Sequence, residues 1–226
     1  MRTCVILPAL NEAACIANVV RETLQQNVAR VIVVDNGSTD ETAAVARDAG
    51  AFVVSETRRG YGYACAAGVN AARDADVLVF MDADGSFLPG ELPRLLEPLY
   101  AARADLVLGS RVLGKMDAGA MPPQQKFGNA LTAFLVRALY RAQISDLGPF
   151  RAVKRELVDS LQMQEMTYGY PTEMIVKAAR QHARIVEVPV SYHARRGGES
   201  KVSGTLRGTV LAGYRILAVT LRYAGA

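Results

Sequence analysis

Two carboxylates one residue apart, Asp82 and Asp84, directly follow the unbroken apolar run 77–81 and precede a glycine and the hydroxyl of Ser86. An apolar run of this length with polar flanks predicts a strand buried on both faces of a sheet. Ionised carboxylates that leave water need a counter-charge, and hard oxygen ligands suit a divalent cation that can also hold phosphate oxygens. The strand end therefore predicts a metal site. The alternative interpretation is that both acids cap the turn and helix that follow.

Two earlier apolar runs, 3–7 and 31–34, also end in polar clusters, at residues 8–12 and 35–40. Helical patterns follow them, one opened by Asn11 and Glu12 and reaching about Gln26, the other over 41–49 and leading into a strand over 51–55. This alternation predicts a parallel sheet with right-handed helical crossovers. Ligands of such sheets bind at the carboxyl ends of the strands, so the three polar clusters should converge on one site.

A glycine pair, Gly60 and Gly62, follows Arg58 and Arg59 and precedes a small-residue helix predicted over 64–72. Glycines at a helix start let backbone amides approach an anion, and the arginines add positive charge. Together with the converging strand ends, this predicts contact with a nucleotide or a phosphate group. A plain loop is the alternative.

The rest of the chain predicts helices over 89–102, from 127 to about 141, over 173–180 and at the C-terminus. It also predicts strands over 105–108 and 185–192 (the latter an edge strand), and loops over 114–125 and 145–151. Two helical stripes are ambiguous between packing on the domain and lying at a membrane surface. The first comprises Phe127, Leu131, Phe134, Leu135 and Ala138; the second comprises Leu206, Val210, Leu217 and Leu221, beside Arg207, Arg215 and Arg222.

Positive charge is concentrated at the C-terminal end. The net charge of the 226 residues is +4, yet the part from Arg195 onward carries +5, because six basic residues there face only Glu199. Such a patch predicts an anionic partner, namely phosphate groups, membrane lipid or nucleic acid. Nucleic acid is disfavoured because the basic residues lie beside apolar helical stripes and no nucleic-acid module is recognisable.

Length and cysteine usage indicate how many domains the chain forms and in which redox setting it works. The length predicts one domain with a sizeable core, and the three cysteines, Cys4, Cys15 and Cys65, favour a reducing, cytoplasmic setting over a disulfide framework. The N-terminus reads as a strand rather than a signal peptide. No stretch approaches the ~20 apolar residues of a spanning helix. The expected protein is cytoplasmic, or peripheral on the inner face of the membrane.

The motifs together resemble family 2 glycosyltransferases. They are Pro8-x-x-Asn11-Glu12, Asp35-Asn36-Gly37-Ser38-x-Asp40, Arg59-x-Tyr61-Gly62-x-Ala64 and Asp82-Ala83-Asp84-Gly85-Ser86. Four later motifs are similar to the dolichol-phosphate mannose synthase-like branch: Gly109-Ser110-Arg111, Asp146 to Arg151, Glu187-Val188-Pro189-Val190 and Gly198-Glu199-Ser200-Lys201. The resemblance covers nearly the whole chain. Some relatives carry C-terminal transmembrane helices, and none is expected in this sequence.

The resemblance implies a nucleotide-diphospho-sugar transferase (GT-A) fold, which is α/β with a mostly parallel, Rossmann-like sheet flanked by helices. It implies a nucleotide-binding half over about 1–111, an acceptor half over about 112–204 and a C-terminal amphipathic helix over about 205–223. It also implies transfer of a hexose, with inversion, from a nucleotide-diphosphate sugar of the GDP-mannose or UDP-glucose type to a polyprenyl phosphate or other lipid acceptor. Self-association into a homo-oligomer is compatible with it.

Roles carry over onto matching positions of this chain. Asp82, Asp84 and Ser86 would hold Mg²⁺ or Mn²⁺ and the diphosphate. The nucleotide would lie against Pro8, Ala9, Asn11, Glu12, Asp35, Gly37, Arg59, Gly62, Asp82 and Ala83. Donor or acceptor phosphates would meet Arg111, Lys126, Arg151, Arg195, Arg196, Ser200 and Lys201. The chain departs from the family pattern at Asn36, at Ser86 and at Leu147-Gly148-Pro149, which affects the sugar, base and acceptor rather than the fold.

The acceptor decides whether the site needs a general base. An acceptor phosphate is already anionic near neutral pH and needs positive charge, for which Lys201 and Arg111 are the candidates. A hydroxyl acceptor, whether soluble or on a glycolipid, would need a carboxylate within hydrogen-bond reach, for which Glu173 and Asp146 are the candidates. Their structural alternatives are an acid at a helix N-terminus and a turn-forming side chain. A nucleotide-sugar-binding regulatory module without turnover is a further alternative, and the intact carboxylates and basic loop weigh against it.

Overall fold

A single seven-stranded sheet forms the centre of the computed structural model, which describes residues 1–195 and 206–224, with side chains for 1–195 and 211–224. The strand order is β3 (Phe52–Ser55), β2 (Arg30–Asp35), β1 (Thr3–Ala9), β4 (Val77–Phe80), β6 (Arg151–Lys154), β5 (Leu106–Ser110) and β7 (Ile185–Pro189). Strand β6 is antiparallel to both neighbours, and the other pairs are parallel. The predicted parallel α/β order is thus found, with β6 as an unpredicted strand inserted from the second half of the chain.

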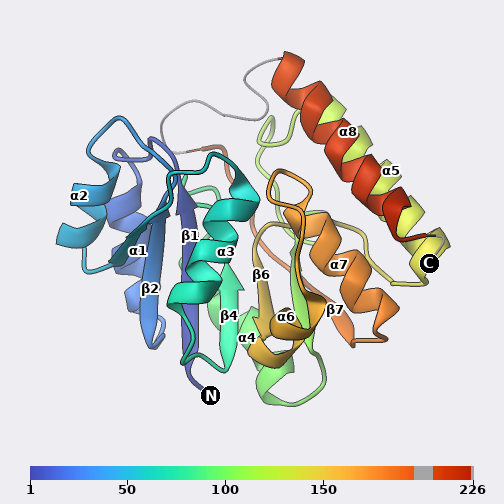
Figure 1. The fold of residues 1–226 in the computed structure, drawn as a ribbon, viewed down its shortest axis with the longest axis horizontal. Helices are drawn as coiled ribbons and strands as arrows, with labels where there is room; N and C mark the ends of the chain where they lie inside the picture. Colours follow the sequence, from blue (N-terminus) through green and yellow to red (C-terminus); the bar gives the residue numbers. More distant parts are fainter. Residues whose placement is uncertain (196–205, 225–226) are drawn as a thin grey trace.

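Helices cover both faces of this sheet (Figure 1). One core packs α1 (Ile16–Leu24), α2 (Thr42–Asp48) and α4 (Leu92–Tyr100, preceded by the 3₁₀ turn Pro89–Glu91) on one face. The other face carries α3 (Tyr61–Ala71), α5 (Pro123–Tyr140), α6 (Arg155–Leu161) and α7 (Tyr170–Arg180). Alternate residues of β1 supply the two cores, with Val5 and Leu7 in the first and Cys4 and Ile6 in the second, as strand geometry requires.

The first helix begins later than its sequence pattern predicts. Asn11 has a φ of 56°, a left-handed conformation that interrupts a helix but suits asparagine, and α1 starts only at Ile16. The backbone amides of Cys15 and Ile16 donate to the carbonyl of Glu12 at 3.0 and 2.9 Å. Residues 10–15 therefore form a loop at the carboxyl edge of the sheet, which is where a ligand would meet them.

Helix α5 buries the opposite face from the one its hydrophobic stripe predicts. Phe127 and Phe134 are 71% and 57% exposed, whereas Asn129, Thr132, Ala133 and Val136 are buried. The buried face combines a hydrogen bond with apolar packing: the Asn129 side-chain oxygen accepts from the Leu147 amide at 3.0 Å, and Ala133 and Val136 pack in the core. The core-helix interpretation of this stripe is wrong.

Helix α8 (Leu206–Arg222) lies alongside α5 at one end of the molecule (Figure 1). The two are joined by a hydrogen bond from the Tyr140 hydroxyl to the Thr220 carbonyl. Ala212, Val219 and Thr220 are buried, while Leu221, a member of the predicted stripe, is 57% exposed. Neither α8 nor any other helix in the described part of the chain has the length and apolarity to cross a membrane.

Candidate functional site

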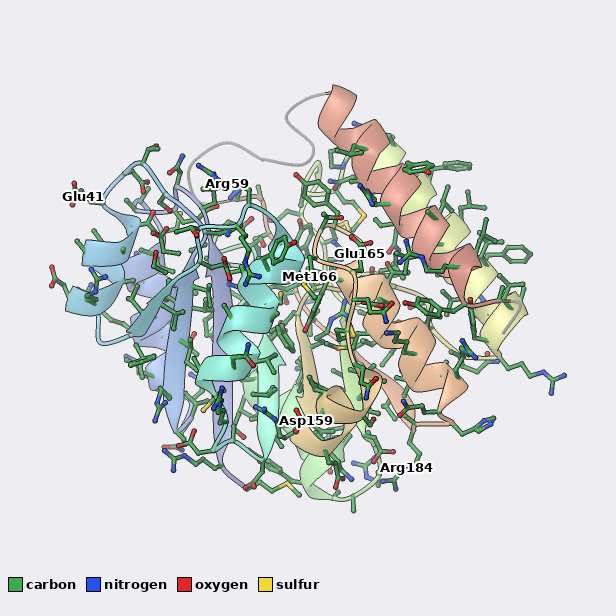
Figure 2. The ribbon with its side chains drawn as sticks, in the orientation of Figure 1. Glu41, Arg59, Asp159, Glu165, Met166 and Arg184 are labelled. Carbon is green, nitrogen blue, oxygen red and sulfur yellow. The ribbon has the colours of Figure 1, made fainter. Side chains whose placement is uncertain are left out.

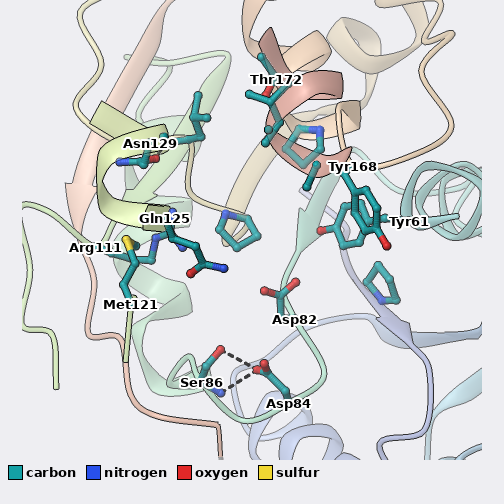
Figure 3. Close-up of a pocket in the computed structure, with 18 of the residues that line it drawn as sticks. Tyr61, Asp82, Asp84, Ser86, Arg111, Met121, Gln125, Asn129, Tyr168 and Thr172 are labelled. Carbon is teal, nitrogen blue, oxygen red and sulfur yellow. Dashed lines mark hydrogen bonds between the residues drawn. The ribbon is translucent and has the colours of Figure 1, made fainter. Parts of the chain in front are cut away.

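A cavity of about 680 Å³ opens at the carboxyl ends of β1, β4 and β5. Figure 3 shows Asp82, Asp84 and Ser86 on one side of it, with residues of α5 and of the segment before α7 opposite. The predicted site residues that line it are Pro8, Ala9, Glu12, Arg59, Asp82, Ala83, Asp84, Ser86, Arg111 and Arg195. The convergence of separate strand ends on one site is thereby found, since β2, β1 and β4 are parallel neighbours.

The paired carboxylates lie just beyond the end of β4. The amide and hydroxyl of Ser86 donate to Asp84 Oδ1 at 3.0 and 2.6 Å, which orients that carboxylate. Burial, and secondly the negative charge of Asp84, raises the pKa of Asp82 to about 7, against the opposing effect of Arg111 and Arg195. Asp82 and Asp84 both line the cavity, and a cation bound between them would favour the ionised form of Asp82.

This donor set fits Mg²⁺ or Mn²⁺ bound together with a diphosphate. In the described residues there is no group of three or more His, Cys, Asp and Glu side chains arranged as a complete metal cage. Magnesium is typically held by one or two carboxylates while substrate phosphates and water supply the remaining oxygens. Asp82 and Asp84 match that arrangement, with Ser86 acting on Asp84.

Arg195 connects the two acidic parts of the site. Its guanidinium pairs with the Glu12 carboxylate and its Nε lies 3.6 Å from Asp84 Oδ2. It thus places positive charge beside the paired carboxylates. The rest of the predicted basic loop, including Arg196, Ser200 and Lys201, lies outside the described residues.

The loops after β1 and β2 hold each other in place. Asn11 Oδ1 accepts from the Thr39 amide at 2.8 Å, and the Glu12 amide donates to the Thr42 hydroxyl at 2.8 Å. Asp35 Oδ1 accepts from the Ser38 amide at 3.0 Å. Of the predicted nucleotide contacts, Asn11, Asp35 and Gly37 do not line the cavity; they shape the loops around it.

Asn36, at which the chain departs from the family pattern, has a clear structural task. Its Nδ2 donates to the carbonyls of Glu56 and Arg58 at 2.9 and 2.8 Å, and its Oδ1 accepts from the Gly60 amide at 2.9 Å. An aspartate could not donate the first two bonds. Asn36 also lines the cavity, so it ties the loop between β3 and α3 to the end of β2 at the cavity wall.

The glycine pair serves close packing. A Cβ on Gly62 would lie 2.5 Å from the Glu165 carbonyl oxygen, and one on Gly60 would lie 2.4 Å from the Met166 carbonyl oxygen. Figure 2 shows Glu165 and Met166 beside the start of α3. Gly60 and Tyr61 line the cavity and Gly62 does not. Gly62 thus lets the segment before α7 pack against α3, close to the cavity.

Arg111 is held by a bidentate ion pair with Asp146. Its Nε and Nη2 donate to the two Asp146 oxygens at 2.9 and 2.7 Å, and its amide donates at 2.7 Å. Burial alone would raise the pKa of Asp146, but the hydrogen bonds and charge of Arg111 outweigh it and hold that pKa below its usual value. Asp146 is fully buried. It therefore acts as a positioning residue for Arg111, and its geometry disfavours a general base.

Glu187 supports this ion pair from behind. Its two carboxylate oxygens accept from the backbone amides of Ser145 and Asp146 at 2.8 and 2.9 Å. The Arg111 guanidinium also stacks over the Tyr192 ring, 5.1 Å from its centroid. Strand β7, the loop before β6 and the end of β5 together fix where the positive charge of Arg111 lies.

Glu173 is buried and its carboxylate is fully engaged in structural contacts. It accepts from the amides of Gln164 and Glu165 at 2.9 and 2.7 Å and from the Tyr223 hydroxyl at 2.6 Å, and it pairs with Lys177 at 3.0 Å. Burial would raise the pKa of Glu173, but these partners hold it below its usual value. Glu173 does not line the cavity, which disfavours it as a general base.

Two predicted phosphate ligands lie elsewhere. Arg151 is buried in β6 and donates to the carbonyls of Pro171, Gly148 and Leu147 at 2.7, 2.6 and 2.5 Å, so it braces the walls of the cavity. Lys126 is exposed on α5 and does not line the cavity, although Gln125 and Gly128 on the same helix do.

Several residues at or near the cavity belong to no motif that the sequence shows. The His193 amide donates to the Ser86 carbonyl at 2.9 Å, and its Nδ1 lies 3.0 Å from Asp117 Oδ2, so His193 ties the carboxylate loop to two other segments. Gln125, Asn129, Tyr168, Thr172 and Tyr192 line the cavity. Single polar residues on helices and loops become recognisable only once the fold brings them together.

Comparison with known proteins identifies the family. The model of Glycosyl transferase family 2 matches residues 4–162. An uncharacterized glycosyltransferase of Mycobacterium tuberculosis is 43% identical over 209 residues, which cover 92% of this chain and 93% of the relative. The undecaprenyl-phosphate mannosyltransferase of Micrococcus luteus is 34% identical over an alignment of 249 residues, gaps included. The alignment covers 100% of this chain and 97% of the relative.

A solved structure supports the same assignment and the fold. Glucosyl-3-phosphoglycerate synthase of Mycobacterium tuberculosis, in complex with Mn²⁺, uridine diphosphate and glucosyl-3-phosphoglycerate, superposes with a TM-score of 0.81 at 27% identity, covering 99% of this chain and 80% of that chain. The predicted GT-A fold is confirmed. The chain belongs to glycosyl transferase family 2 and is a hexosyltransferase.

Proposed function

We propose that this enzyme transfers a hexose, with inversion, from a nucleotide-diphosphate sugar of the GDP-mannose or UDP-glucose type to a polyprenyl phosphate. One observation carries the choice of acceptor: both carboxylates considered as general bases, Asp146 and Glu173, are held in ion pairs away from the cavity surface. Among the described residues, the acids that line the cavity are Glu12, Asp82 and Asp84. Their tasks are the pair with Arg195 and the metal, so an acceptor that is already ionised suits the site best.

The donor side is built to stabilise a departing nucleoside diphosphate. Asp82 and Asp84 would hold Mg²⁺ or Mn²⁺, and the metal would supply charge neutralisation of the diphosphate, worth several kcal/mol in the transition state. Arg195 adds positive charge at the same place, 3.6 Å from Asp84. The bond from the anomeric carbon to the diphosphate breaks as the acceptor oxygen attacks the opposite face of that carbon, which inverts its configuration.

The acceptor side combines one positive charge with apolar walls. Arg111 lines the cavity, and its position is set by Asp146 and Tyr192. The cavity is also lined by Leu131 of α5 and by Ile216 and Leu217 of α8, together with small residues of the same two helices. A polyprenyl phosphate fits this lining, with its phosphate near Arg111 and its isoprenoid chain against the apolar residues of α5 and α8.

Known relatives favour this acceptor and offer a second one. The Micrococcus luteus relative is an undecaprenyl-phosphate mannosyltransferase, and its match covers the whole of this chain. The solved glucosyl-3-phosphoglycerate synthase was crystallised with a soluble product, so a soluble acceptor is the second candidate. With a lipid acceptor the enzyme would act at a membrane surface, and we propose the inner, cytoplasmic face.

A product screen tests the proposal. Purified enzyme would be given GDP-mannose, UDP-glucose and related donors with Mn²⁺ or Mg²⁺ and detergent-dispersed polyprenyl phosphate, and the lipid phase would be analysed for a sugar-linked product. We expect lipid-linked hexose from one donor, lost on chelation of the metal. A parallel reaction offers phosphoglycerate instead of polyprenyl phosphate, and its water-soluble products are analysed for the sugar. Transfer to phosphoglycerate, with none to polyprenyl phosphate, would establish the soluble alternative.

A further inference from the structure

Large exposed apolar side chains gather on α5 and α8. Phe127, Phe134 and Leu139 of α5 are 71%, 57% and 43% exposed, and Leu211, Tyr214 and Leu221 of α8 are 47%, 66% and 57% exposed. Two adjacent helices thus contribute half of the exposed large hydrophobic residues of the described chain. We call these six residues the α5–α8 surface. Concentrated apolar exposure of this kind marks a site of interaction rather than ordinary scatter.

The same two helices carry positive charge without any negative charge. Neither 123–140 nor 206–222 contains Asp or Glu, while Lys126, Arg137, Arg207, Arg215 and Arg222 lie within them and Arg141 follows α5. Aromatic and aliphatic side chains beside Lys and Arg, with acids excluded, are typical of helices that lie in the headgroup region of a bilayer. The charge pattern selects an anionic occupant.

The α5–α8 surface also lies next to the acceptor side of the cavity. Leu131 and Thr132 of α5 and Ile216 and Leu217 of α8 line the cavity, so the two helices that expose the apolar residues also form its wall. Figure 1 shows α5 and α8 together at one end of the molecule. Whatever binds these helices from outside is therefore held close to the cavity.

We propose that the α5–α8 surface docks on an anionic lipid bilayer, with Phe127, Phe134 and Tyr214 entering the interface and the arginines contacting lipid headgroups. This inference rests on the proposed function, because it names the surface that would supply a membrane-embedded acceptor. A second copy of the chain is a poorer occupant. Pairing two such surfaces about a two-fold axis would bring only positive side chains of these helices together.

The experiment compares the wild-type chain and four variants in co-sedimentation with vesicles. The vesicles are either phosphatidylcholine alone or equal parts phosphatidylcholine and phosphatidylglycerol. Phe127→Ser with Phe134→Ser should weaken binding to the anionic vesicles at least about tenfold. Arg215→Gln with Arg222→Gln should weaken it about fivefold per charge, and wild-type binding should fall as salt rises.

Matched controls replace the same residue types elsewhere. Phe52→Ser removes an aromatic residue that is 51% exposed on β3, and Arg47→Gln with Arg73→Gln removes two exposed arginines. Both controls should bind anionic vesicles as the wild type does. Thermal unfolding of every variant verifies folding. Weakening of the controls and the surface variants to the same extent would overturn the proposal.

Transfer to detergent-dispersed polyprenyl phosphate separates this inference from the proposed function. Surface variants that lose vesicle binding but keep detergent transfer support the docking surface. Wild-type enzyme that transfers sugar in detergent but binds neither kind of vesicle overturns the docking surface and leaves the proposed function standing. Surface variants that change only the oligomeric state, with vesicle binding unaltered, would assign the α5–α8 surface to self-association and overturn the proposal as well.

Discussion

Asp84 is a donor to the metal in our account, and its orientation depends on two hydrogen bonds from Ser86. We expect Asp84→Ala to abolish transfer and the metal-dependent part of nucleotide binding, because Asp82 alone leaves the cation with one carboxylate. Calorimetric titration of UDP or GDP with and without Mn²⁺ measures this. Asp48→Asn, an exposed acid on α2, is the control. Near-normal transfer by Asp84→Ala with EDTA present would remove the metal from the mechanism.

Asp146 offers a second test at this scale, because a positioning residue and a general base respond differently to pH. We expect Asp146→Asn to lower transfer while the shape of the pH–rate profile stays as in the wild type, since the bidentate hold on Arg111 is lost but no proton acceptor is. Losing a charge-assisted hydrogen bond costs roughly 1.5–3 kcal/mol, or tenfold or more. Loss of the acidic limb of the profile, with a fall of about 10²–10⁴-fold, would make Asp146 the base.

The contact between α7 and α8 depends on Glu173. Its carboxylate links Lys177 on its own helix, the Tyr223 hydroxyl after α8 and two amides before α7. We expect Glu173→Gln to lower the free energy of unfolding by about 3–5 kcal/mol, the usual effect of breaking a buried pair, while transfer per folded molecule stays within a few-fold of wild type. Urea denaturation and a rate normalised to folded protein measure the two effects. A stable but inactive Glu173→Gln enzyme would return Glu173 to the chemistry.

Strands β5 and β7 are joined through a second ionic cluster, centred on Asp105. It accepts from Arg184 Nε and Nη2 at 2.9 and 2.7 Å and pairs with Lys154 at 2.9 Å. Hydrogen bonds from Arg184 chiefly hold the pKa of Asp105 far below its usual value, against the smaller opposing effect of burial. A lowered folded-state pKa stabilises the protein above about pH 4, the usual pKa of an aspartate, and this is lost as the pH falls toward the folded-state value.

We therefore expect Asp105→Asn to lower the free energy of unfolding at pH 7 by about 1–3 kcal/mol. The difference from the wild type should shrink as the pH falls below about 4. Urea denaturation at a series of pH values measures it, and Asp48→Asn serves again as the matched control. A difference that stays constant down to pH 2 would show that Asp105 acts through packing instead of charge.

Helices and strands were predictable from the sequence to different degrees. Strands β1, β2 and β4 follow from unbroken apolar runs, and the carboxylates that follow β4 are recognisable in one dimension. Strand β6 was not predicted, because Arg151 and Lys154 make its sequence polar. In the fold the Arg151 guanidinium is buried and donates hydrogen bonds to backbone carbonyls. The face of α5 was predicted wrongly because hydrophobicity alone ignores the hydrogen bond that turns Asn129 inward. Those determinants are long-range contacts, and a local pattern does not contain them.

At the scale of the whole molecule, the seven-stranded sheet draws strands from both predicted halves and brings their polar ends to one cavity. The proposed donor side belongs to the β1–β2–β4 end, whose loops are recognisable as sequence motifs. The proposed acceptor side is made by α5, α7 and α8, whose cavity-lining residues form no such motif. The family and the candidate metal carboxylates are therefore predictable from the sequence, while the proposed acceptor depends on where Asp146, Glu173 and the apolar walls lie in the fold.

The proposed function requires that the atom attacking the anomeric carbon be an oxygen of a lipid phosphate. The most direct measurement gives the wild-type enzyme, at saturating donor and Mn²⁺, equal concentrations of polyprenyl phosphate, the unphosphorylated polyprenol of the same chain length, and phosphoglycerate. Sugar incorporated into each acceptor is then quantified. We expect product on polyprenyl phosphate with at least about 10²-fold preference over the polyprenol, because among the described residues the cavity-lining acids Glu12, Asp82 and Asp84 are assigned to the pair with Arg195 and to the metal, which leaves none of them to activate a hydroxyl. Comparable transfer to the polyprenol, or transfer to phosphoglycerate in preference to both lipids, would contradict it.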